Sequence, residues 1–112
     1  MSQAASKIRS RTPREPERAE LQLVAVLHAL ADPLRLDIVR FLSSASGEQA
    51  CNQCRCPQVA KSTIAHHFKV LRQAGILSSR EVGTSLQNSL RLVDLEARFP
   101  GLLPAILRTS ES

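Results

Sequence analysis

The sequence has no tryptophan and no tyrosine, and only three phenylalanines occur in its 112 residues. The core should therefore be built from aliphatic side chains. No apolar run approaches the roughly 20 residues that a membrane-spanning helix needs, and no charged start leads into the apolar segment of a signal peptide. These absences predict a cytoplasmic protein that does not span a membrane.

Patterns typical of catalysis are also missing. The chain has no glycine-rich phosphate loop and no Ser, His and Asp set with catalytic spacing. Asp32, Asp37 and Asp94 fall at predicted helix starts or on faces predicted to be solvent-exposed. The sequence therefore predicts that this protein is not an enzyme.

Basic residues outnumber acidic residues by 15 to 10, which gives a formal net charge of +5. This excess favours a polyanionic partner, either nucleic acid or an anionic membrane surface. Residues 1–14 carry several cations and too few apolar groups to fold, so a disordered basic arm is expected there. It would serve as a solubilising tail or contact phosphates non-specifically. Residues 15–108 are expected to form one domain.

The strongest helix signal lies in the middle of the chain. Ile64, Phe68 and Leu71 recur at i, i+4 and i+7 and form one apolar stripe. Ser62 suits an N-cap and Gly75 suits the left-handed position after the last turn, so the helix should run between them. The opposite face carries polar and basic groups and no acid, which suits DNA. An ordinary solvated helix face has the same pattern, so the neighbouring elements must decide.

A first helix is predicted from Glu15 or Pro16 to Leu30. Its apolar residues form two stripes, Leu23, Leu27 and Leu30 on one side, and Leu21, Val24 and His28 on the other. One subunit cannot cover both faces, so we expect this helix to form part of a dimer seam, with His28 as a partly buried packing residue.

Asp32 and Pro33 form an N-cap followed by a proline at the first helical position, which predicts the central core helix. Its expected core residues are Leu34, Leu36, Ile38, Val39, Phe41 and Leu42, and its expected solvent-facing residues are Arg35, Asp37 and Arg40. A short third helix is predicted at about 48–55, with Ser46 as N-cap and Pro57 as its limit. Together with the helix that follows, it would make a helix-turn-helix.

After Gly75 the pattern changes to alternation, which predicts two strands, 76–82 and 86–92, joined by a glycine-containing loop. Leu90 and Leu92 are expected to face the core, and Arg80, Arg91 and the loop are expected to face water. A hairpin directly after a DNA-facing helix is a wing that reaches phosphates or the minor groove. Asp94 is the expected N-cap of a last helical region that Pro100, Gly101 and Pro104 break into short or bent helices. Its apolar residues, including Ile106, would contribute to the partner surface.

Val26–Leu42 (VLHALADPLRLDIVRFL), Ser62–Leu77 (STIAHHFKVLRQAGIL), Val82–Thr84 (VGT) and Leu95–Leu107 (LEARFPGLLPAIL) occur in this order. Through them the chain resembles the ArsR family of bacterial winged-helix repressors over residues 20–107. The resemblance implies a mainly α fold with a small β-hairpin, a dimeric winged helix-turn-helix. It also implies a homodimer that binds an inverted repeat of double-stranded DNA in its own promoter and is released by an inducer.

The resemblance assigns the recognition positions to Ser62, Thr63, Ala65, His66 and Lys69, with Ala65 where the family usually has serine. With the flanking and hairpin residues, the predicted DNA-binding set is Lys61, Ser62, Thr63, Ala65, His66, Lys69, Arg72, Gln73, Arg80, Thr84 and Ser85. His67 fills a family histidine position that faces partly inward.

Cys51, Cys54 and Cys56 fall within six residues. In a reducing cytosol thiols this close suggest metal or redox chemistry, and a bend at Pro57 would bring all three together as soft sulfur ligands. A Cys51–Cys54 disulfide and buried small hydrophobes are the alternatives. The resemblance places Cys51 at the second cysteine of the arsenic-sensing Cys-x-Cys site, but Gln49 takes the place of the first. A site for arsenite, antimonite or another thiophilic ion built from Cys51, Cys54 and Cys56 would therefore differ from the family's standard arrangement.

These observations predict a homodimeric repressor. Two alternatives stay open: a repressor that needs no ligand, and a protein-interaction module whose basic face binds an acidic partner or a membrane. Only a specific DNA-binding protein would distinguish its own promoter from scrambled DNA.

Overall fold

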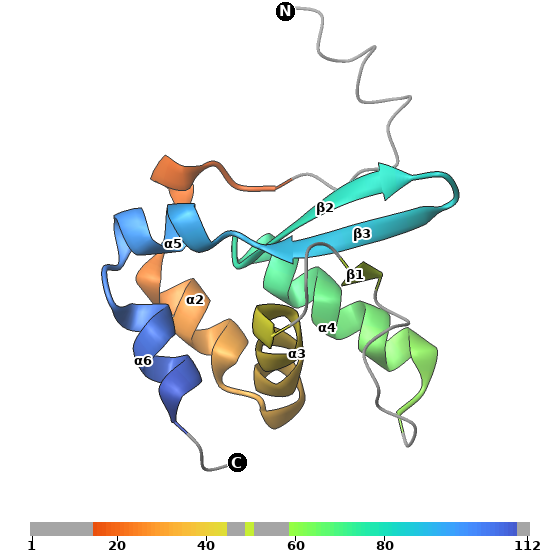
Figure 1. Cartoon of the computed structure of the whole chain (residues 1–112), viewed down its shortest axis with the longest axis horizontal. Coiled ribbons are helices and arrows are strands. Elements are labelled where there is room, and N and C mark those ends of the chain that lie inside the picture. The colour runs from red at the N-terminus through yellow and green to blue at the C-terminus, as the bar shows by residue number, and fades with distance from the viewer. Residues whose placement is uncertain (1–14, 45–48, 51–58, 110–112) are drawn as a thin grey trace, which may run out of the picture.

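The computed structural model describes residues 15–44, 49–50 and 59–109. The elements are η1 (Arg18–Glu20), α2 (Leu23–Leu30), α3 (Pro33–Ser44), β1 (Gln49–Ala50), α4 (Lys61–Gln73), β2 (Leu77–Val82), β3 (Ser85–Leu90), α5 (Leu92–Arg98) and α6 (Leu102–Arg108). The predicted mainly α fold with a small hairpin is confirmed. Figure 1 shows α2, α5 and α6 at one end of the molecule and the hairpin tip at the other. In the described part of the chain, no helix is both long and apolar enough to cross a membrane. The expected basic arm lies outside the described residues.

The core is almost entirely aliphatic, as the composition predicts. The predicted stripe of α4 is buried: Ile64, Phe68 and Leu71 are 7%, 2% and 0% exposed. They belong to one cluster with Ile38 and Val39 of α3, which are fully buried. The polar face of α4 is therefore held outward by burial of the opposite side.

The start of α3 follows the predicted capping pattern. Asp32 Oδ1 accepts hydrogen bonds from the backbone N–H groups of Leu34 (2.9 Å) and Arg35 (3.1 Å). The bond from Arg35 is the main cause that lowers the pKa of Asp32 below 3.8. Arg35 and Arg40 are half-buried, so their predicted position in solvent is wrong. The Arg35 guanidinium donates to the carbonyl of Ala29 (2.6 Å), which would otherwise be unsatisfied at the end of α2.

The first helix begins later than predicted. Residues 18–20 form a 3₁₀ turn, Leu21 and Gln22 are extended, and α2 starts only at Leu23. Long-range partners determine the later helix start. Leu21 is buried in the core at 1% exposure, and the Glu15 carboxylate accepts hydrogen bonds from β2. His28 is exposed in the single subunit, so its predicted packing role in a dimer seam stays a prediction.

The helix predicted at about 48–55 is contradicted at its start. Gln49 and Ala50 form β1, which pairs with Asn88 and Gln87 of β3. The sheet order is β1-β3-β2, all antiparallel. An edge of β3 was available for pairing, and that pairing outweighs the capping-box pattern. The predicted cap at Ser46 and the segment up to Pro57 lie outside the described residues.

α4 begins one residue earlier than predicted, with Ala60 instead of Ser62 as N-cap. Its end agrees with the prediction, since Gly75 has φ +87°. The N–H groups of Gly75 and Ile76 donate to the carbonyls of Arg72 and Leu71, both at 3.0 Å. This is the Schellman arrangement, which satisfies the last carbonyls of a helix and turns the chain into β2.

The hairpin is confirmed, with pairing from Leu77↔Leu90 to Val82↔Ser85 around a two-residue loop. Leu90 packs on the core and Arg80 is exposed, as predicted. Arg91 and Leu92 have exchanged their predicted roles. Leu92 is 54% exposed, while the Arg91 side chain is only 10% exposed and donates to the carbonyl of Pro16 (2.6 Å).

Asp94 is not an N-cap, because α5 starts at Leu92 with Arg91 as N-cap. Instead its carboxylate binds Arg18 (2.7 Å) and Arg91 (2.9 Å), and these hydrogen bonds, Arg18 first, lower the pKa of Asp94 below 3.8. The predicted break is confirmed at Pro100 and Gly101, whereas Pro104 lies in the first turn of α6 and does not interrupt it. Gly101, at φ +79°, separates α5 from α6.

Gly75→Ala should lower the free energy of unfolding more than Gly83→Ala. Both residues have positive φ, +87° and +63°, and a side chain there costs about 1 to 2 kcal/mol. Only at Gly75 would the added methyl overlap Leu21 Cδ2, whereas Gly83 has nothing within 4 Å. Overpacking of this kind adds about 1 to 3 kcal/mol. Urea denaturation measures both variants, and equal losses would show that Leu21 moves aside without cost.

Candidate DNA-binding surface

The outer face of α4 presents most of the predicted DNA-binding residues together. Lys61, Ser62, Thr63, Ala65, His66, Lys69 and Gln73 are all exposed. The helix has 13 residues, about 20 Å, and contains no acid. A helix of this size fits a major groove about 12 Å wide. The face therefore has the shape and charge to enter that groove.

Two residues of α4 are partly turned inward. Arg72 is half-buried, and its guanidinium donates to Ser79 Oγ of β2 at 3.4 Å. His67 is half-buried as expected, with Nδ1 3.1 Å from Arg35 Nη1. Arg72 therefore lies where the helix meets the hairpin, and His67 belongs to the contact between α3 and α4.

The hairpin supplies the remaining predicted residues. Arg80 and Thr84 are exposed, whereas Ser85 is half-buried. The Ser85 hydroxyl donates to the Val82 carbonyl (3.2 Å) and accepts from Gln87 Nε2 (3.2 Å), so it fixes the loop. In Figure 1 the hairpin tip and the N-terminal end of α4 project toward the same side of the molecule.

A buried polar pair joins the strands of the hairpin and was not predicted. Ser79 Oγ donates to Asn88 Oδ1 at 2.6 Å, and these residues are only 5% and 2% exposed. Alternation placed Ser79 on the same strand face as buried Leu77, and this signal could have identified it. Nothing in the sequence indicated that Glu15 binds the backbone of the same residue.

The cysteine hypothesis concerns a different segment. Cys51, Cys54 and Cys56 lie outside the described residues. Among the residues that are described, no group of three or more His, Cys, Asp or Glu side chains could hold a metal ion.

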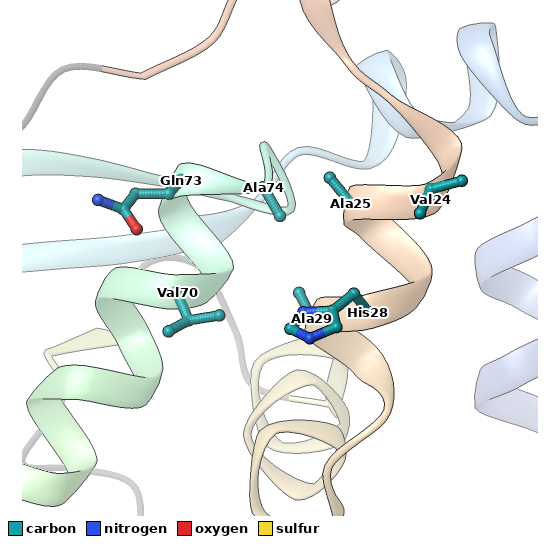
Figure 2. A pocket seen from close by; sticks show the side chains of 7 residues that line it. All are labelled: Val24, Ala25, His28, Ala29, Val70, Gln73 and Ala74. Atoms are coloured by element: carbon teal, nitrogen blue, oxygen red, sulfur yellow. The ribbon is translucent and has the colours of Figure 1, made fainter.

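A shallow groove of about 430 Å³ lies between α2 and the C-terminal end of α4. Figure 2 shows its lining, which is Val24, Ala25, His28 and Ala29 from α2 and Val70, Gln73 and Ala74 from the end of α4. Small apolar side chains dominate this lining. Gln73, assigned to the DNA-binding face, therefore also borders the groove.

An acid-free exposed helix, followed directly by a β-hairpin and packed on a helical core, defines a winged helix-turn-helix DNA-binding protein. The model of the bacterial regulatory protein arsR family matches residues 32–79. The HTH-type transcriptional regulator YceK of Bacillus subtilis is 32% identical over 83 residues, which cover 72% of this chain and 82% of YceK. The chain belongs to the arsR family of bacterial transcriptional regulators.

Solved structures show the same fold. The transcriptional repressor BigR from Xylella fastidiosa has a TM-score of 0.61 at 21% identity, over 100% of this chain and 99% of BigR. The homodimeric winged helix-turn-helix DNA-binding domain of Mb0332 from Mycobacterium bovis has a TM-score of 0.60 at 20% identity, over 96% and 87%.

Lys69→Ala should weaken DNA binding, because Lys69 is an exposed cation in the middle of the acid-free face. Loss of one phosphate contact should lower the slope of log K against log salt by about 0.9. Arg108→Ala removes the same charge at the exposed end of α6 and is the matched control. Fluorescence anisotropy across a salt series measures both variants. Equal slopes for wild type and Lys69→Ala would mean that another face of α4 meets the DNA.

Proposed function

We propose that this regulator is a cytoplasmic, homodimeric repressor that binds an inverted-repeat operator through α4 and the hairpin. The observation that carries this proposal is the acid-free exposed face of α4 beside a hairpin with exposed Arg80 and Thr84. Its family consists of transcriptional regulators, and BigR, of the same fold, is a transcriptional repressor.

The residues of the surface divide by chemistry. Lys69 and Arg80 would contact phosphates, which position the protein without conferring sequence specificity. Ser62, Thr63 and His66 carry donors and acceptors that fit base edges in the major groove. Lys61, Ala65, Arg72, Gln73, Thr84 and Ser85 complete the proposed set. Ala65 offers a methyl group where a thymine methyl would be the matching partner.

The proposed dimer rests on apolar side chains that the subunit leaves exposed. On α2, Leu23, Val24 and Leu27 are 45%, 78% and 44% exposed, and on α5, Leu92 and Val93 are 54% and 73% exposed. Clusters of this kind mark protein interfaces. Both helices lie at the end of the molecule opposite the hairpin tip (Figure 1). A second copy packed there would leave both α4 helices free, and the two-fold symmetry would match an inverted repeat.

The proposed domain covers residues 15–108, with residues 1–14 as a basic arm that adds phosphate contacts. Lys7, Arg9, Arg11 and Arg14 are its cations. The described chain starts at Glu15, whose side chain is bonded to β2 of the hairpin. The arm would therefore join the domain beside the hairpin.

Release from the operator is proposed to act through Cys51, Cys54 and Cys56. The support is their spacing, since three thiols within six residues match the ligand preference of arsenite, antimonite and other thiophilic ions. Binding requires thiolates, so affinity for the ion should rise with pH. A repressor that uses no ligand is the competing proposal.

Footprinting on the region upstream of its own gene tests DNA recognition and release together. Wild type should protect a short inverted repeat, and arsenite or an oxidant should remove the protection. A variant with Ser at all three cysteine positions should bind normally and no longer respond. Binding to scrambled DNA as tight as to the upstream region would overturn the repressor and favour an interaction module. A response that persists in the triple variant would place the inducer site elsewhere.

Leu27→Glu and Val24→Glu should give monomers, because each places a charge on the proposed dimer face. Val24 is 78% exposed in the subunit, so its substitution should leave the subunit fold intact. Ser43→Glu, at an exposed position near the end of α3, is the matched control. Sedimentation velocity measures the mass. A dimeric Val24→Glu variant would show that the interface lies on another face, with α6 and its half-buried Ile106 as the next candidate.

A further inference from the structure

The hairpin is attached to the N-terminal segment through Glu15. Its Oε1 accepts from Ser78 Oγ at 3.0 Å, and its Oε2 accepts from the Ser79 backbone N–H at 2.7 Å. Because β3 lies between β1 and β2, β2 is an edge strand. Its outward N–H at Ser79 is thus paired with a side chain. Hydrogen bonds to a carboxylate are roughly twice as strong as those between neutral groups.

Ser79 connects this contact to the recognition helix. Its buried hydroxyl donates to Asn88 of β3 (2.6 Å) and accepts from Arg72 in the last turn of α4 (3.4 Å). One serine is therefore bonded to the N-terminal segment, to the neighbouring strand and to α4. A shift of Ser79 would change the position of the hairpin relative to the helix.

Glu15 is itself held in place by its neighbours. Arg91, which directly follows β3, donates a hydrogen bond to the carbonyl of Pro16 at 2.6 Å. Further along, Leu21 is buried against Gly75 at the end of α4. The segment that follows Glu15 is thus anchored at Pro16 and again at Leu21.

We propose that Glu15 is a positioning residue for DNA binding, which holds the hairpin at the angle to α4 that brings Arg80 onto the phosphates. This inference rests on the proposed use of the hairpin in DNA binding. The proposed effect of losing Glu15 on DNA affinity is opposite in direction to the effect expected from net charge alone. Removing an acid raises the net charge from +5 to +6 and should by itself tighten binding to a polyanion, whereas loss of positioning should weaken it.

The test is Glu15→Gln, which keeps the shape of the side chain and removes its ability to accept with both oxygens. Operator affinity should fall about two- to tenfold, the range for replacing a hydrogen bond to a carboxylate with one to a neutral amide. Asp37→Asn makes the same charge change at an exposed carboxylate of α3, 3.8 Å from half-buried Arg40, and should not weaken binding. Thermal unfolding checks that each variant is folded.

A double-mutant cycle with Arg80→Ala separates positioning from general destabilisation. If Glu15 acts through the hairpin cation, Glu15→Gln should lose its effect in the Arg80→Ala background. An equal loss in both backgrounds, or unchanged or tighter binding by Glu15→Gln alone, would overturn the proposal. If Glu15→Gln does not fold, Ser78→Ala removes only one of the two bonds and should weaken binding in the same direction; unchanged affinity would then overturn it. Wild type that does not distinguish operator from scrambled DNA would instead contradict the proposed function.

Discussion

The left-handed turn at Gly75 is the constraint on which the arrangement of the DNA-binding elements depends. It closes α4 with two backbone hydrogen bonds and sends the chain directly into β2. The absence of a side chain also leaves the space that Leu21 fills. One residue therefore fixes both the root of the hairpin and the packing of the N-terminal segment. A substitution that adds strain or bulk at Gly75 would therefore disturb α4, β2 and the N-terminal segment together.

Local signals predicted the elements whose cause is local. The Asp32 cap, the stripe of Ile64, Phe68 and Leu71, and the turn at Gly75 depend on residues close in sequence, and all three are confirmed. The outward face of α4 followed directly, because burial of one side of a helix determines which residues face solvent. The exposed positions of the predicted DNA-binding set on α4 could therefore be placed from the sequence, with the exception of half-buried Arg72.

Long-range partners explain the errors. Glu15 was assigned to a helix start because acids suit that position, but Ser78 and Ser79 bind it more than 60 residues away. Arg91 was predicted to face water because charged side chains usually do. Instead, its guanidinium is hydrogen-bonded to the Pro16 carbonyl and paired with Asp94. Gln49 pairs with Asn88 across the sheet. Periodicity in the sequence does not reveal contacts between distant residues, so these hydrogen bonds could be identified only from the structure.

The short strand β1 ties a second part of the chain to the hairpin. Ala50 pairs with Gln87 of β3, and the next residue in the sequence is Cys51. The helix α4 begins at Lys61, so the cysteine segment is bounded by a sheet strand before it and by the recognition helix after it. The two described elements that it connects are therefore β1 and α4. A covalent change at Cys51, Cys54 or Cys56 would therefore fall on the single connection between a strand of the sheet and α4.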